Sequence, residues 1–119
     1  MARRRIDPAD GTLAVAAWRR DDEPPRSTIA TAVRFTLEEL AERAPGNSVE
    51  VRVPPLGVTQ CIEGPRHTRG TPPNVVETDA VTFFRLCAGR TAWADALASG
   101  VIAASGLRAD LSEMVPLLG

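Results

Sequence analysis

The sequence predicts an α+β fold in which a small, mostly antiparallel sheet of four to five strands packs with about five helices. Three observations predict it. Apolar residues recur at helical spacing over 28–43, which favours an amphipathic helix. They alternate with polar residues over 49–53, as in a half-buried strand. Residues 79–115 divide at glycines into short apolar segments, which indicates further helices and a strand.

The first expected element is a helix over residues 8–20. Asp7 is a favoured N-cap, and Pro8 stands at the first helical position, where its missing N–H removes no hydrogen bond. Gly11 weakens this helix. The expected inner face carries Leu13, Ala16, Ala17 and Trp18.

The second expected element is the strongest helix of the chain, at about residues 28–43. Ser27 is a suitable N-cap for it, and Pro45-Gly46 ends it. The apolar stripe of this helix consists of Ile29, Val33, Leu37, Leu40 and Ala44. The charged residues of the segment fall largely outside that stripe, so one face of the helix is expected to be buried.

A β-hairpin is expected next. Valines alternate with Glu50 and Arg52 over 49–53, a turn follows at 54–57, and 58–63 is the return strand. Residues 64–73 form a polar loop without periodicity. These features predict an antiparallel pair with one buried face.

The last third of the chain is expected to hold two strands and three helices. A short strand at 74–77 precedes a helix that is capped by Asp79 or Thr78 and ended by Gly89. Thr91 caps a second helix, which Gly100 ends. The strand at 101–105 is apolar without alternation, so we expect it to be covered on both faces. After Gly106 a final helix carries Leu111, Met114, Val115 and Leu118, with Pro116 ending or kinking it.

The composition describes one ordinary globular domain, residues 1–119. With 14 basic and 15 acidic residues the net charge is −1, so no overall field attracts nucleic acid or an anionic membrane. All the basic residues are arginine, which we attribute to coding bias. No run approaches the ~18 apolar residues of a membrane span, and no apolar signal region follows the arginines at 3–5. We expect a cytoplasmic protein without nucleic-acid binding or stable membrane insertion.

The sequence offers no catalytic constellation. Two cysteines and one histidine supply neither a disulfide framework nor a zinc site. Cys87 lies on an apolar helical stripe and is expected to be an inert core thiol. Cys61 and His67 could form a nucleophile pair, but a separation of six residues establishes no contact. We therefore predict that the protein is not an enzyme and has no catalytic residue, metal or cofactor.

The polar loop contains the one cluster that could bind an anion. His67 lies between Arg66 and Arg69, and these side chains could hold a carboxylate or phosphate head group. The alternative, which we favour, is that His67 is a solvated or structural loop residue.

Three local patterns between Asn74 and Leu118 resemble the sterol carrier protein family. Residues 78–84 resemble the acidic cap and aromatic helix of that family, and 88–90 resemble its short stop of glycine and a basic residue. Residues 94–106 resemble the segment in which a helix passes through glycine into the last strand. The chain looks closest to a bacterial, actinobacterial-type branch of small stand-alone proteins. The resemblance implies a sheet with helices on one side and an apolar tunnel between the sheet and the terminal helices.

By this resemblance, the cavity walls are Phe83, Phe84, Leu97, Leu111, Met114 and Val115. The terminal helix would act as a lid. An ordinary filled core would use the same residue types at the same spacing. The interpretation that these residues fill a core without a cavity therefore stays open.

Two functions remain in view from the sequence. The first is a small cytoplasmic binding protein with an apolar cavity for a lipid, a fatty-acyl compound or a sterol-like ligand. The second is a non-catalytic accessory or dimerisation module, similar to the C-terminal domain of mycothiol-dependent maleylpyruvate isomerases. The second function would require a homodimer or a partner enzyme.

Overall fold

The computed structural model describes residues 4–64 and 74–118 and has four helices and four strands along them. The elements are α1 (Pro8–Arg20), α2 (Arg26–Arg43), β1 (Val49–Val53), β2 (Gly57–Cys61), β3 (Val75–Thr78), α3 (Ala80–Cys87), α4 (Trp93–Ser99) and β4 (Ile102–Ser105). The predicted α+β fold is confirmed. The described residues hold one helix fewer than expected.

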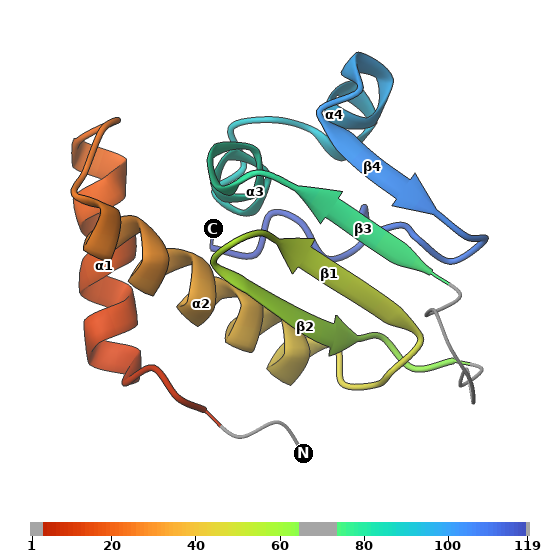
Figure 1. Cartoon of the computed structure of the whole chain (residues 1–119), viewed down its shortest axis with the longest axis horizontal. Helices are drawn as coiled ribbons and strands as arrows, with labels where there is room; N and C mark the ends of the chain where they lie inside the picture. Colours follow the sequence, from red (N-terminus) through yellow and green to blue (C-terminus); the bar gives the residue numbers. More distant parts are fainter. Residues whose placement is uncertain (1–3, 65–73, 119) are drawn as a thin grey trace.

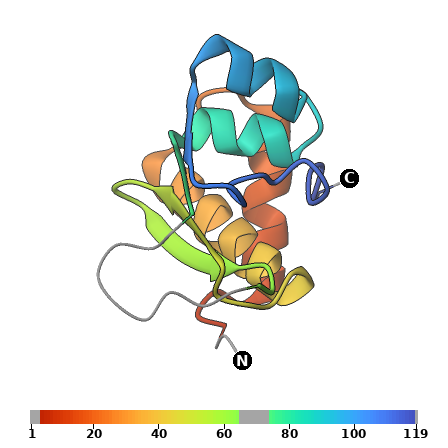
Figure 2. The same ribbon diagram turned by 90° about the vertical axis from the view of Figure 1, so that its right-hand side faces the viewer.

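The strands form one sheet in the order β2-β1-β3-β4 (Figure 1). β1 pairs with β2 antiparallel and with β3 parallel, and β3 pairs with β4 antiparallel. Two of the three pairs are antiparallel, which confirms the predicted character of the sheet and the β1–β2 hairpin. Seen from the side, α1, α2 and α3 lie together on one side of the sheet (Figure 2).

The alternation in β1 decides which face of the sheet is buried. Val49, Val51 and Val53 are wholly buried, and α2 lies behind their hairpin (Figure 1). Glu50 and Arg52 turn to the opposite face, where their side chains form an ion pair. The sheet therefore has one apolar face that packs on helices and one polar face.

Helix α1 begins as predicted but buries a different face. The Asp7 carboxylate accepts a hydrogen bond from the Ala9 N–H at 2.9 Å, and Pro8 opens the helix. Trp18 is buried as expected, whereas Leu13 is 69% exposed. The buried stripe is Gly11, Ala14, Val15 and Trp18. The stripe is displaced because Gly11 lacks a side chain, so that α1 comes close to α2 there.

Helix α2 begins earlier than expected. Ser27 lies inside the helix, the N-cap is Pro25, and no side chain caps the first turn. Proline serves here because its φ is restricted to about −65°. The apolar stripe is confirmed by the burial of Val33, Leu37 and Leu40.

The expectation that the last strand is covered on both faces is wrong. β4 is an outer strand of the sheet. Ile102 is buried, while Ala103, Ala104 and Ser105 are exposed. The expectation took the absence of alternation as a sign of burial on both faces. Small residues occur at buried and at exposed positions alike, so this pattern does not distinguish the two.

The expected terminal helix is also absent, and turns occupy that part of the chain up to residue 118. Pro116 disfavours helical backbone at Val115 and supplies no N–H. The Asp110 carboxylate accepts from the Ser112 N–H at 2.8 Å, a local turn that competes with a helix. The N–H groups of Leu117 and Leu118 instead donate to the Cys87 carbonyl at 2.9 and 2.8 Å. This C-terminal segment, residues 111–118, is thereby fastened to the end of α3.

Candidate ligand-binding groove

A groove of about 680 Å³ lies between α1, α2 and the C-terminal segment. Its lining residues are Pro8, Thr12, Val15, Ala16, Arg19, Phe35, Glu39, Arg43, Leu117 and Leu118. The five from α1 lie at helical spacing, so they form one stripe of that helix. The three from α2 are spaced four residues apart and form a second stripe. The volume lies in the range of roughly 300–1,000 Å³ that small-molecule sites occupy.

The lining divides into an apolar part and a charged part. Val15, Ala16, Phe35, Leu117 and Leu118 supply aliphatic and aromatic surface. Arg19, Arg43 and Glu39 supply charge. Such a combination suits an amphipathic ligand, whose chain is desolvated while its polar head is paired.

The two arginines connect the helices to the chain end. The Arg43 guanidinium donates through Nη1 to the Leu117 carbonyl at 2.6 Å. The Arg19 guanidinium donates through Nη2 to the Leu118 carbonyl at 2.9 Å. A guanidinium carries five N–H donors, so both side chains retain donors for a ligand.

Glu39 partly offsets this positive charge. Its carboxylate lies 3.3 Å from Arg43 Nη2 and also pairs with Arg4. The hydrogen bond from Arg4 to Glu39 is the main cause that raises the pKa of Arg4. Two arginines and one glutamate leave the groove lining with an excess of positive charge, which favours an anionic head group.

Five of the six residues predicted to line a cavity lie in or against one apolar core. Phe83, Phe84 and Leu111 are buried in it, and Met114 and Val115 are half-buried against it. Leu97 lies apart from them on α4 and is 44% exposed. The structure thus brings the five together, and their role as cavity walls stays a prediction.

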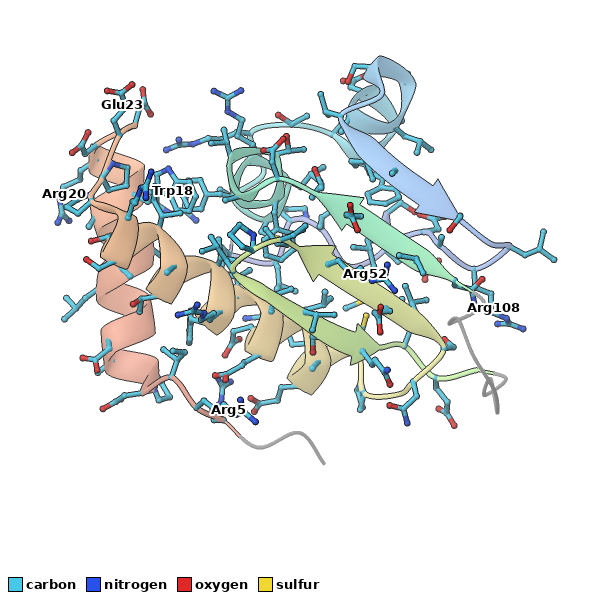
Figure 3. The ribbon with its side chains drawn as sticks, in the orientation of Figure 1. Arg5, Trp18, Arg20, Glu23, Arg52 and Arg108 are labelled. Atoms are coloured by element: carbon cyan, nitrogen blue, oxygen red, sulfur yellow. The ribbon has the colours of Figure 1, made fainter. Side chains whose placement is uncertain are left out.

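A stacked aromatic pair joins α1 to α3 within this core. The rings of Trp18 and Phe84 are 4.2 Å apart at their centroids and inclined by 3°. The Trp18 side chain extends from α1 toward α3 in Figure 3. The Arg90 guanidinium lies 5.4 Å from the Phe84 centroid. In the structure, Phe84 thus packs against Trp18 rather than facing open space.

The predicted head-group residues Arg66, His67 and Arg69 lie outside the described residues. His67 is also one half of the possible nucleophile pair with Cys61, so that pairing lies outside the described residues as well.

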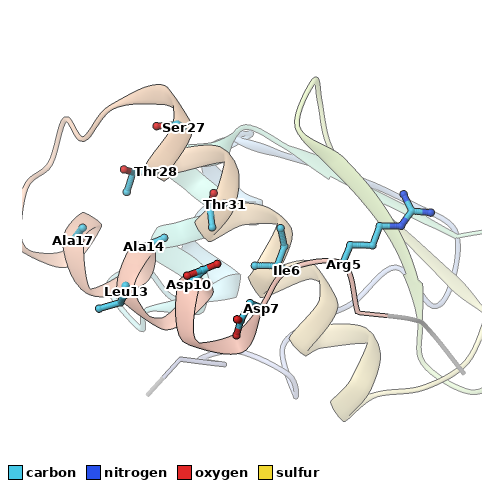
Figure 4. Close-up of a pocket in the computed structure, with 10 residues that line it drawn as sticks. All are labelled: Arg5, Ile6, Asp7, Asp10, Leu13, Ala14, Ala17, Ser27, Thr28 and Thr31. Carbon is cyan, nitrogen blue, oxygen red and sulfur yellow. The ribbon is translucent and has the colours of Figure 1, made fainter.

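A second hollow of about 450 Å³ lies across the start of α1 and α2 (Figure 4). Asp7 and Asp10 line it from the α1 side, and Ser27, Thr28 and Thr31 line it from α2. The remaining lining residues are Arg5, Ile6, Leu13, Ala14 and Ala17. Carboxylates and hydroxyls make up a larger share of this lining than of the groove's, and they match an apolar chain poorly. The groove at the C-terminal segment is therefore the better candidate for an amphipathic ligand.

The thiols have the character of core residues. Cys61 and Cys87 are buried, and burial raises the pKa of Cys61 to about 11 and that of Cys87 to about 12. At neutral pH both are thiols rather than the nucleophilic thiolates. In the part of the chain that the structure describes, no group of three His, Cys, Asp or Glu side chains could hold a metal ion.

The order of elements along the chain and the comparison with known families indicate the same protein family. A family model described as a bacterial SCP ortholog matches residues 25–117. The chain belongs to the sterol carrier protein family. The match runs from the start of α2 to Leu117, so it includes the whole sheet of this sterol carrier protein and most of its C-terminal segment. Sterol carrier proteins are in general non-catalytic carriers of apolar ligands.

No curated protein matches the chain. Among the helices that the structure describes, none has the length and apolarity to cross a membrane.

Sequence reasoning did not identify the groove. Its α1 stripe mixes Thr12 and Arg19 with Val15 and Ala16, and no apolar periodicity marks such a stripe. The available signal was the helical spacing of positions 8, 12, 15, 16 and 19, which places them on one stripe of α1. This stripe forms part of a groove only because α2 and the C-terminal segment lie beside it.

Proposed function

We propose that this sterol carrier protein is a non-catalytic cytoplasmic carrier of a single amphipathic lipid, most simply a fatty-acyl compound. In this proposal residues 1–119 act as one domain. One observation carries the proposal. The groove between α1, α2 and the C-terminal segment combines an apolar lining with two arginines.

The energetics are sufficient for a carrier. Each methylene that leaves water gains about 0.8 kcal/mol, so some ten of them supply roughly 8 kcal/mol. A charge-assisted hydrogen bond to Arg19 or Arg43 adds about 1.5–3 kcal/mol. Loss of translational and rotational freedom removes at least about 4 kcal/mol of this. The balance is at most about 5.5–7 kcal/mol, which corresponds to a Kd of roughly 10–100 μM.

In this proposal the C-terminal segment is the lid, as a chain of turns rather than as a helix. Leu117 and Leu118 line the groove, and Met114 and Val115 lie directly before them against the core. Displacement of this segment would open the groove toward the residues predicted from the sequence to line a cavity.

The direct experiment measures binding of fluorescent fatty acids and native mass spectra of the freshly purified protein. Saturable binding is expected with one lipid per chain. Ala16→Phe fills the groove and is expected to weaken binding by about tenfold or more, a change of about 1.4 kcal/mol. Ala94→Phe is the matched control, because Ala94 is exposed on α4 and its replacement leaves the groove unaltered.

The head-group part of the proposal has its own readout. Arg19→Gln with Arg43→Gln is expected to weaken binding of a fatty acid more than binding of the fatty alcohol of equal length. Arg85→Gln, at an exposed position on α3, is the control for general loss of charge. Equal losses for acid and alcohol would contradict the assignment of the arginines, and no saturable binding of either lipid would contradict the carrier function.

Three of the six residues predicted from the sequence to line a cavity are tested in the same assay. Met114→Ala and Val115→Ala are expected to weaken binding if the lid opens toward the core. Leu97→Ala is expected to do so only if a ligand also reaches the outer surface of α4. Wild-type affinity in all three variants would restrict the ligand to the groove.

A further inference from the structure

The leading segment, residues 4–7, is fastened to α2 by a glutamate of that helix. The Glu38 carboxylate accepts the Arg5 N–H at 2.8 Å through Oε2 and the Ile6 N–H at 3.1 Å through Oε1. Figure 4 shows Arg5 and Ile6 on this segment, ahead of α1. The two hydrogen bonds hold the backbone directly after Arg4, so the Arg4 side chain starts from a defined place on α2.

The Arg4 guanidinium contacts two residues that line the groove, Phe35 and Glu39. Its Cζ lies 5.7 Å from the centroid of the Phe35 ring, and its Nη2 pairs with Glu39 and with Glu42. The Glu39 side chain is 17% exposed, whereas that of Glu42 is 62% exposed. Water screens a partly buried pair less than an exposed one, so the charge of Arg4 acts chiefly on Glu39.

Glu39 divides its two oxygens between two arginines. Oε1 pairs with Arg4, and Oε2 lies 3.3 Å from Arg43 Nη2. A carboxylate that places both oxygens on one guanidinium forms a strong bidentate pair. Because Arg4 holds Oε1, Glu39 is kept from forming such a pair with Arg43.

We propose that Arg4 keeps Arg43 available to an anionic head group in the groove. This inference rests on the proposed carrier function. Arg4 is a positioning residue in it, because it acts through Glu39 and does not touch the ligand. Three arginines (Arg4, Arg19 and Arg43) and one glutamate give a net charge of +2. Removal of Arg4 leaves +1 and a carboxylate that is free to pair fully with Arg43.

A purely structural role of Arg4 leads to a different expectation. If Arg4 only tied the leading segment to α2, its replacement would weaken binding of every ligand alike. If Arg4 acts through Glu39, its replacement weakens binding of an anion and leaves a neutral ligand unaffected, because a neutral head carries no charge for Arg43 to attract. A fatty acid and the fatty alcohol of equal length therefore separate the two roles.

Binding titrations of the full chain with these two lipids at neutral pH test the proposal. Arg4→Gln is expected to weaken binding of the acid about fivefold, a change of about 1 kcal/mol, and to leave binding of the alcohol unchanged. Arg4→Lys keeps a positive charge beside Glu39 and is expected to retain most of the preference for the acid. Arg5→Gln is the matched control, since it removes the same charge from an exposed position of the same segment. It should leave both affinities unchanged.

Removal of Glu39 tests whether Arg4 acts through it. In the double variant Arg4→Gln with Glu39→Gln, no carboxylate of the groove competes for Arg43, so binding of the acid is expected to return to the wild-type level. Arg4→Gln with Glu42→Gln is the control for loss of a negative charge on α2, and it should stay as weak as Arg4→Gln alone.

The outcomes distinguish the role of Arg4 from the carrier function. Unchanged binding of the acid by Arg4→Gln, equal losses for acid and alcohol, or no recovery on Glu39→Gln would overturn the role of Arg4 and leave the carrier function standing. A wild-type protein that binds neither lipid would overturn the carrier function, and the role of Arg4 with it.

Discussion

Gly11 shows how one missing side chain sets the distance between two helices. A Cβ atom built at this position would lie 2.2 Å from Phe35 Cγ and 2.7 Å from Phe35 Cβ. The second of these atoms is bound to the α2 backbone, so a rotation of the ring does not relieve the contact. Gly11 weakens α1 as an isolated helix, yet it permits the contact that buries Trp18 and Ala14.

We expect Gly11→Ala to destabilise the protein. Overpacking costs about 1–3 kcal/mol, which outweighs the gain of up to about 1 kcal/mol in helix propensity. Urea denaturation followed by tryptophan fluorescence measures the change. A double-mutant cycle with Phe35→Leu supplies the control, since a smaller residue at 35 should reduce the cost. An equal cost in both backgrounds would show that another contact limits the approach of α1.

At the scale of single elements, the helix starts differ in how they are capped. The Asp79 carboxylate accepts from the Thr82 N–H at 2.8 Å and opens α3. Ser27, which the sequence pattern suggested as the cap of α2, lies within that helix, and no side chain caps α2. Composition alone does not distinguish these two positions, because both residue types are favoured caps.

Because a side chain caps α3 but not α2, replacing Asp79 and replacing Ser27 are expected to change the free energy of unfolding by different amounts. Asp79→Ala is expected to lower the free energy of unfolding by about 1 kcal/mol. Ser27→Ala is expected to change it by less than about 0.5 kcal/mol, as for an ordinary surface substitution. Chemical denaturation of the two variants under one set of conditions measures both. A larger loss for Ser27→Ala than for Asp79→Ala would contradict the cap assignment.

At the scale of the whole molecule, the thiols report on the core. Cys61 and Cys87 belong to the same buried cluster as the valines of β1. The chain has no tyrosine, and all its basic residues are arginine. The two thiols are therefore the only side chains whose ordinary pKa values fall between about 8 and 12.

This composition predicts an alkaline loss of stability that comes from the thiols. Burial raises each pKa from 9.0 to about 11 or about 12, so the folded state retains protons that the unfolded state releases. The stability they contribute is complete below about pH 9 and is lost as the pH rises through the folded values. The expected slope is about 1.4 kcal/mol per pH unit for each thiol. Urea midpoints at a series of pH values measure it.

The double variant Cys61→Ala and Cys87→Ala is the control, since it should flatten this alkaline dependence. Thiol reagents at pH 8 are expected to react with the wild type only as it unfolds. Rapid labelling of the native protein would contradict the burial of the thiols.

Features that depend on neighbouring residues could be predicted from the sequence. The Asp7-Pro8 start of α1, the apolar stripe of α2, the alternation of β1 and the cap at Asp79 are all local signals. Each of them works through a hydrogen bond or a periodicity within a few positions. The order of elements follows from such signals, and with it the sterol carrier fold.

Only the tertiary structure determined how those elements pack against one another. The buried face of α1 depends on Phe35 of another helix, and the exposure of β4 depends on its place at the edge of the sheet. The C-terminal segment follows the carbonyl of Cys87 instead of its own helical periodicity. The groove requires Arg19 beside Leu118, a hydrogen bond between residues 99 positions apart. Such contacts form because packing distant parts of the chain against one another lowers the free energy of the folded state. The local propensity of each residue contains no information about which distant parts will meet.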